Sequence, residues 1–169
     1  MNTHLTPSRF FVRLVGACGI NLLLASGFSA AIAAPNPDSC ALIKPSDIAS
    51  VLGGTPVAHA MGKNCNWSAS GSNKKLTLLR LDPGSPKMTP EMGFAGMREN
   101  LQRRSQVTDE PGLGDNAFSS VDMKSGMAVL VIIKHGQLIQ LQYWSTAEPL
   151  GAADLDALRI VAKKIIAAL

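Results

Sequence analysis

The feature that most constrains this chain is a hairpin signal in its C-terminal half. Residues 127–134 form an apolar run rich in β-branched side chains, which favours a strand. His135-Gly136 follows and suits a two-residue hairpin turn. Residues 137–144 then alternate apolar and polar side chains, which is typical of an antiparallel strand with one buried face. The sequence therefore predicts a sheet with antiparallel pairing.

Three helices are expected around this sheet. The first opens at Pro45-Ser46-Asp47 and ends at Gly53-Gly54, because proline suits the first helical position and glycine the end. The second begins at Thr89-Pro90-Glu91, with an N-cap, a proline and a first-turn acid. Its glycines, Gly93 and Gly96, can allow close packing on a sheet. The last helix runs from about Ala152 to the C-terminus, and its apolar stripe consists of Leu155, Leu158, Ala162, Ile165 and Leu169.

Further strands are expected at Leu76–Leu81, which carries apolar residues on both faces, around Cys65–Trp67, and at Ala117–Val121. Val57–Ala60 is a possible short strand, and Ser105–Asn116 is expected to be a polar loop. The order is α-β-β-α-β-β-β-α. It predicts a single α+β domain, a mostly antiparallel sheet packed by about three helices.

The first 33 residues have the pattern of a secretory signal peptide. Arg9 and Arg13 precede an uncharged stretch from Leu14 to Ala34, which closes with the A-x-A motif Ala31-Ile32-Ala33. We expect cleavage after Ala33, which leaves residues 34–169 as a periplasmic or secreted domain. The alternative is an uncleaved anchor, since the uncharged stretch is long enough to span a membrane.

Val15-Gly16-Ala17-Cys18 offers another reading of the leader, because it looks like a lipobox that would make Cys18 a lipidated N-terminus. Only four residues separate Arg13 from Cys18, which is short for the apolar part of a leader. We therefore expect membrane association only if Cys18 is lipidated, and we favour the unlipidated form.

Two cysteines, Cys40 and Cys65, follow the leader. In an exported chain such a pair most often forms a disulfide. A metal site is the rival interpretation, but Cys40, Cys65 and His59 lack the short paired spacings of zinc sites. We expect one disulfide, no metal and no cofactor.

The charge pattern bears on partners. All 12 acidic residues and 14 of the 16 basic ones follow the leader, which leaves a net charge of +2. The basic residues are dispersed or in isolated pairs, so no nucleic-acid partner is expected.

A resemblance covers nearly the whole exported part. Its residues are the segment from Cys40 to Gly54, Cys65-Asn66-Trp67, the turn from Gly112 to Ala117, the hairpin and the closing helix. Together they resemble DUF3558-type exported lipoproteins and, more loosely, the extracellular sensor domains of mycobacterial receptor kinases. The resemblance implies an extracytoplasmic α+β domain and supplies no catalytic residues.

Two places are candidate binding sites. Gly112-Leu113-Gly114-Asp115 can form a nest of backbone N–H groups for an anion, although a tight turn that needs positive φ explains the same residues. Tyr143 and Trp144 are adjacent on a strand and point to opposite faces. An exposed Trp144 is a candidate contact for a sugar, peptide or protein. The alternative is that Trp144 packs beneath the last helix.

No catalytic residues stand out. No serine lies in a G-x-S-x-G elbow, His59 and His135 are expected at the surface, and nothing selects a carboxylate pair from Asp82, Glu91, Glu99, Asp109, Glu110 and Asp115. We expect a non-enzymatic exported binding or sensor-like domain of the bacterial cell envelope, whose partner is an envelope protein or a small ligand. The alternatives are a small hydrolase of peptidoglycan or another polymer, and an inhibitor that inserts Ser105–Asn116 into a secreted enzyme.

Overall fold

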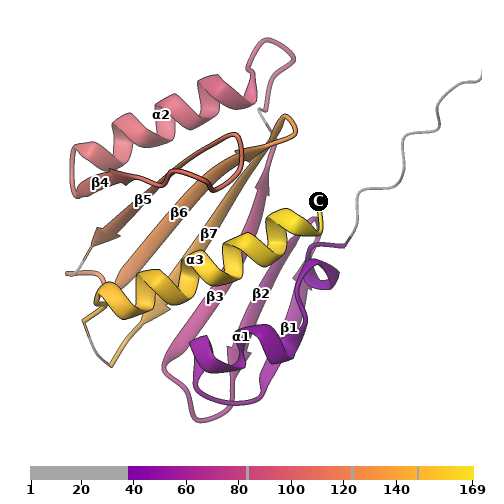
Figure 1. Cartoon of the computed structure of the whole chain (residues 1–169), viewed down its shortest axis with the longest axis vertical. Helices are drawn as coiled ribbons and strands as arrows, with labels where there is room; N and C mark the ends of the chain where they lie inside the picture. The colour runs from indigo at the N-terminus through magenta and orange to yellow at the C-terminus, as the bar shows by residue number, and fades with distance from the viewer. Residues whose placement is uncertain (1–37, 83, 123, 148) are drawn as a thin grey trace, which may run out of the picture. The chain divides into compact units, whose positions relative to one another are not determined.

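A computed structural model of the chain describes residues 38–82, 84–122, 124–147 and 149–169. Within them, seven strands form one sheet in the order β1-β2-β3-β7-β6-β5-β4, and every neighbouring pair is antiparallel (Figure 1). The strands are β1 (Pro56–Met61), β2 (Asn64–Ala69), β3 (Lys74–Leu81), β4 (Gln106–Asp109), β5 (Asn116–Asp122), β6 (Met127–Lys134) and β7 (Gln137–Ser145). The helices are a 3-10 turn η1 (Ser39–Leu42), α1 (Pro45–Leu52), α2 (Pro90–Gln102) and α3 (Ala152–Ala167). The predicted α+β class is confirmed, and the predicted elements follow one another in the expected order. The structure adds two strands to that order: β1, which corresponds to the possible short strand Val57–Ala60, and β4.

The predicted hairpin is the centre of the sheet. β6 and β7 pair from Met127↔Trp144 to Lys134↔Gln137, and His135 and Gly136 turn between them with φ of 48° and 70°. Two positive φ values match a type I′ turn, whose twist suits adjoining strands. β6 is buried on both faces because helices cover both sides of it.

α1 and α3 cover one face of the sheet (Figure 1). α1 begins at Pro45 and ends where Gly53, with φ of 74°, donates its N–H to the carbonyl of Ala49. On α3 the residues that pack into the core are Leu158, Val161, Ala162 and Ile165. The largest side chains they cover, Trp67 and Tyr143, are fully buried. The Tyr143 hydroxyl lies 3.2 Å from both the carbonyl oxygen of Val51 and Asp154 Oδ1, which links β7 to both helices.

α2 lies on the opposite face, where Phe94 and Leu101 pack on β5, β6 and β7. Thr89 caps this helix by accepting the N–H of Met92 at 3.3 Å. A Cβ on Gly93 would stand 2.9 Å from the side chain of Leu138, whereas Gly96 faces open space. Close packing on the sheet therefore explains the first helical glycine and not the second.

The segment expected as a polar loop at Ser105–Asn116 contains β4, which forms the edge of the sheet beside β5. Only Val107 in this strand is apolar, so the sequence has no alternation of apolar and polar residues that would predict a strand here. The strand exists because β5 supplies a partner for its backbone groups. The prediction of a loop over the whole of Ser105–Asn116 is therefore wrong. The segment is a sheet edge followed by a turn in which Glu110 and Leu113 are buried.

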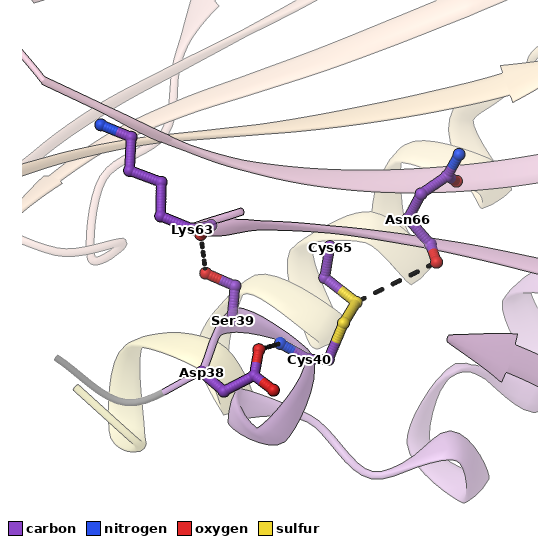
Figure 2. Close-up of a disulfide and its surroundings, with 6 residues drawn as sticks. All are labelled: Asp38, Ser39, Cys40, Lys63, Cys65 and Asn66. Carbon is purple, nitrogen blue, oxygen red and sulfur yellow. Dashed lines mark hydrogen bonds between the residues drawn. A yellow bond between two sulfur atoms is a disulfide. The ribbon is translucent and has the colours of Figure 1, made fainter. Parts of the chain in front are cut away.

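The predicted disulfide between Cys40 and Cys65 is present, with the two Cα atoms 5.1 Å apart (Figure 2). It ties η1 to β2. Asp38 caps η1 by accepting the N–H of Cys40 at 3.0 Å, and the Ser39 hydroxyl donates to the carbonyl of Lys63. The segment that precedes α1 is thereby fixed to the sheet.

The described residues contain no helix that is both long and apolar enough to span a membrane. The expected signal peptide at residues 1–33, its cleavage site and the lipidation candidate Cys18 lie outside the described residues.

Candidate functional site

One face of the sheet is only half covered. α2 packs over β5, β6 and the start of β7, and no described helix lies over the same face of β1, β2 and β3. We call this surface the open face. It consists of the outward side chains Val57, His59, Met61, Asn64, Asn66, Ser68, Lys75, Thr77, Leu79, Gln142 and Trp144, all exposed or half-buried.

The contrast between the two faces of the same strands shows that the open face is distinct. On β2, Cys65 and Trp67 are fully buried toward α1, whereas their neighbours Asn64, Asn66 and Ser68 are half-buried on the other side. A face that is solvated in an antiparallel sheet normally alternates polar residues with the buried ones, and β2 follows this rule.

Strand register arranges the open face in rows. His59 pairs with Asn66, Asn66 with Thr77, and Thr77 with Gln142. This row therefore presents an imidazole, two amides and a hydroxyl across four strands, with neutral hydrogen-bonding groups throughout its centre. Within the described residues, Asn66 Oδ1 has no hydrogen-bond partner although it is buried.

A second row, beside the first, adds an aromatic and a cation. Val57 pairs with Ser68, Ser68 with Lys75, and Lys75 with Trp144. Trp144 is 36% exposed, and Val57 and Met61 are 51% and 46% exposed. Because Trp144 points away from α3, the alternative that it packs beneath the last helix is wrong. Its neighbour Tyr143 occupies that place instead.

Comparisons with known proteins do not identify this surface. The chain matches no protein-family model, no curated protein and no solved structure. The resemblance to DUF3558-type exported lipoproteins therefore stays a prediction, and function has to be argued from the geometry.

The other candidate site, at Gly112, Gly114 and Asp115, is a turn packed against the β6–β7 hairpin. Gly112 and Gly114 have φ of 81° and 67°. A Cβ on Gly114 would stand 2.4 Å from the carbonyl oxygen of Ile133, so only glycine fits there. Asp115 accepts the backbone N–H of His135 at 2.8 Å and an ion pair from Lys134 at 3.2 Å. These bonds lower the pKa of Asp115, the N–H of His135 contributing most. The carboxylate thus holds the hairpin turn.

A buried ion pair lies between this turn and α3. The Glu110 side chain is 7% exposed. It accepts Arg159 Nε at 2.7 Å, Arg159 Nη2 at 2.6 Å and the Ser119 hydroxyl at 2.6 Å. Burial opposes ionisation of Glu110, but these hydrogen bonds outweigh it and hold its pKa below the ordinary value. The pair fastens α3 to the connection between β4 and β5.

The six candidate carboxylates, all within the described residues, are engaged with other partners rather than poised as the pair that a glycoside hydrolase needs. Five of the six candidates lie in ion pairs with basic side chains: Asp82, Glu99, Asp109, Glu110 and Asp115. The sixth, Glu91, accepts from Thr89, which lowers its pKa. A carboxyl that donates a proton near neutral pH needs a raised pKa. Hydrogen bonds and ion pairs lower the carboxyl pKa instead at six described residues: Asp47, Glu91, Glu110, Asp115, Asp122 and Asp154.

Neither the cavity at one end of the sheet nor the grouping of the described metal-binding side chains offers a second candidate site. A cavity of about 400 Å³ at one end of the sheet is lined by Lys63, Arg80, Asp82, Pro90 and Gln137, among others, and its charged groups are already engaged: Lys63 pairs with Asp82, and Arg80 donates to Gln137 at 2.5 Å. In the part of the chain that the structure describes, no three His, Cys, Asp or Glu side chains are grouped to hold a metal ion.

Sequence reasoning singled out Trp144 and missed the row beside it. His59, Asn66, Thr77 and Gln142 come from four strands, and only the register brings them together. The signal that can find such residues is the polar half of the alternation in each strand, read together once the strand order is known.

Proposed function

We propose that this protein is a non-enzymatic, exported domain of the bacterial cell envelope that binds a partner protein through the open face. The observation that carries the proposal is the uncovered half of the sheet, with Trp144 exposed at its border. Tryptophan is enriched among the residues that dominate protein interfaces, and the neutral polar row beside it can pair with backbone or side-chain groups of a partner.

The shape and charge of the surface support a protein partner. Small-molecule sites are concave and enclose most of their ligand, whereas this surface is one face of a sheet. The residues of the open face include Lys75 and His59 and no carboxylate, so an acidic rim on the partner complements it. The lowered carboxyl pKa values favour binding over the alternative of a polymer hydrolase.

A cross-linking experiment tests the binding surface. A photoreactive amino acid is placed at Thr77 or Gln142 on the open face, and at Ile160, which is 57% exposed on α3, as the matched control. We expect the two open-face positions to yield the same protein adduct in the native envelope, and Ile160 to yield none of it. Trp144→Ala should weaken binding of the isolated partner about tenfold or more, as removal of an interface anchor does.

Three outcomes would contradict the proposal. Equal adducts from Ile160 would place the contact elsewhere. The absence of adducts from the open face would remove the surface from consideration. An adduct that disappears when peptidoglycan is digested would replace the protein partner by a glycan.

Export is tested separately by the intact mass of the protein recovered from its host. We expect the mass of residues 34–169, with no thiol labelled until a reductant is added, because Cys40 and Cys65 are bonded. A mass that begins at Cys18 and carries acyl chains would make the protein a lipoprotein. A full-length mass would leave the leader as an uncleaved anchor.

A further inference from the structure

β1 is an edge strand whose outer side is open. Among the described strands it pairs only with β2, and residues 57–61 are all exposed. The strand contains no Lys, Arg, Asp or Glu, and its one proline, Pro56, stands at the first position. Such an edge presents unpaired N–H and C=O groups that can bind another strand.

The opposite edge of the sheet is protected. β4 has only four residues, Gln106–Asp109, and ends at Asp109, which pairs with Arg98. Short length and charge are the usual protections of an edge strand. Strand addition is therefore expected at β1 rather than at β4.

The β1–β2 turn decides which residues of β1 face outward. Met61 pairs with Asn64 across the two residues Gly62 and Lys63, and Gly62 has φ of 62°, which suits the first position of a type II′ turn. The pair that closes a two-residue hairpin is hydrogen-bonded, and such pairs alternate along the strands. The backbone groups of Val57, His59 and Met61 therefore form hydrogen bonds with β2. Those of Ala58 and Ala60 point outward, away from β2.

The sequence of β1 is nearly symmetric about its centre. Val57-Ala58-His59-Ala60-Met61 reads the same in both directions in size and polarity. Two copies paired antiparallel about an axis through His59 place Ala58 opposite Ala60, and each of these pairs exchanges both of its hydrogen bonds. A two-fold interface requires this kind of self-complementarity. We propose that the protein forms a homodimer by antiparallel pairing of its β1 strands, centred on His59.

The side chains permit this pairing. Ala58 and Ala60 lie on the face that α1 occupies and add little bulk, and His59 lies on the open face beside Asn66. The axis is perpendicular to the sheet, because the paired strands are antiparallel and related by two-fold symmetry. Both open faces then lie on the same side of one continuous sheet. The dimer does not depend on what the open face binds.

Sedimentation of the exported chain tests the dimer. Ala60→Pro removes the outward N–H and inserts a ring at the interface, whereas an edge strand tolerates proline where its N–H faces solvent. Ala60→Ser is the matched control, because it keeps the N–H. We expect the wild type to dimerise, Ala60→Pro to weaken the dimer about tenfold or more, and Ala60→Ser to stay within about threefold. A monomeric wild type at all concentrations, or an equally stable Ala60→Pro dimer with native circular dichroism, would overturn the proposal.

Disulfide cross-linking tests the register of the proposed β1–β1 pairing. It also tests the dimer itself if the Ala60→Pro variant does not fold. The proposed pairing places the two copies of residue 59 opposite each other, with Cβ atoms about 4.5–5.5 Å apart, so mild oxidation should link His59→Cys into a dimer. The two copies of residue 57 lie about 13 Å apart along the strands, so Val57→Cys should stay unlinked. The native disulfide does not compete, because Cys65 is buried on the other face. Equal linking of both variants would overturn the register.

Discussion

Replacing Cys40 and Cys65 together by alanine is expected to lower the free energy of unfolding by about 3.5 kcal/mol. The bond closes a sequence separation of 25 residues, and the loss of loop-closure entropy in the unfolded chain gives this magnitude. For a domain of this size the thermal midpoint should fall by on the order of 10 °C. Urea unfolding, monitored by circular dichroism, measures the difference.

Reductant provides the control for this prediction. Wild-type protein unfolded in the presence of reductant should approach the stability of the alanine variant, and the variant itself should not respond to reductant. Alanine is preferred to serine, because Cys65 is fully buried and a serine hydroxyl there would add a desolvation cost of its own. Equal urea midpoints for the wild type and the variant would show that the bond contributes nothing to stability.

Arg159→Ala is expected to destabilise the protein by about 2–3 kcal/mol at pH 7. Removing one partner of a buried pair leaves the other charge uncompensated, which costs about 3–5 kcal/mol when both are fully buried. We expect a loss below that range because the pair is only partly buried: the Arg159 side chain is 31% exposed, against 7% for Glu110. Chemical denaturation at pH 7 measures the loss.

A double variant separates the charge effect from lost packing. Glu110→Gln combined with Arg159→Ala leaves no buried charge, so it should be more stable than Arg159→Ala alone. If the double variant is no more stable than Arg159→Ala, the uncompensated charge of Glu110 is not the source of the destabilisation.

The pH dependence of the same pair has a defined sign. The folded pKa of Glu110 is lowered, so its contribution is complete above the unfolded value of about 4.3 and is lost as pH falls through the folded pKa. In Arg159→Ala, Glu110 is buried without its cation, and protonation at low pH removes the penalty. The stability difference between wild type and variant should therefore narrow from pH 7 to pH 4.

Most of the fold follows from local signals in the sequence. The hairpin of β6 and β7 and the starts of α1 and α2 are predicted by residues that lie within a few positions of each other, such as Thr89 and Pro90. β4 is not, because a four-residue edge strand with one apolar side chain takes its conformation from its neighbour β5. Local patterns do not contain information about a partner strand.

Less of the candidate site could be predicted from the sequence, because the site also depends on which strands are neighbours. Trp144 could be placed opposite Tyr143 by strand geometry alone, but which of the two faces α3 depends on the strand order. The row from His59 to Gln142 and the pairing of Glu110 with Arg159 join residues that are distant in the chain. Long-range register brings them together, and no spacing rule within a single element predicts it.

The path of the chain through the sheet also determines the order in which it can fold. β1, β2 and β3 form one local meander, and β4 to β7 form another, while β3 pairs with β7 across the whole intervening segment. A chain emerging N-terminus first therefore holds β3 with one unsatisfied side until β7 arrives. Closing such a long loop is slow compared with hairpin formation. The Cys40–Cys65 bond joins η1 to β2, and both lie ahead of β4 in the chain. An oxidising enzyme can therefore lock η1 onto the first meander before the second meander docks.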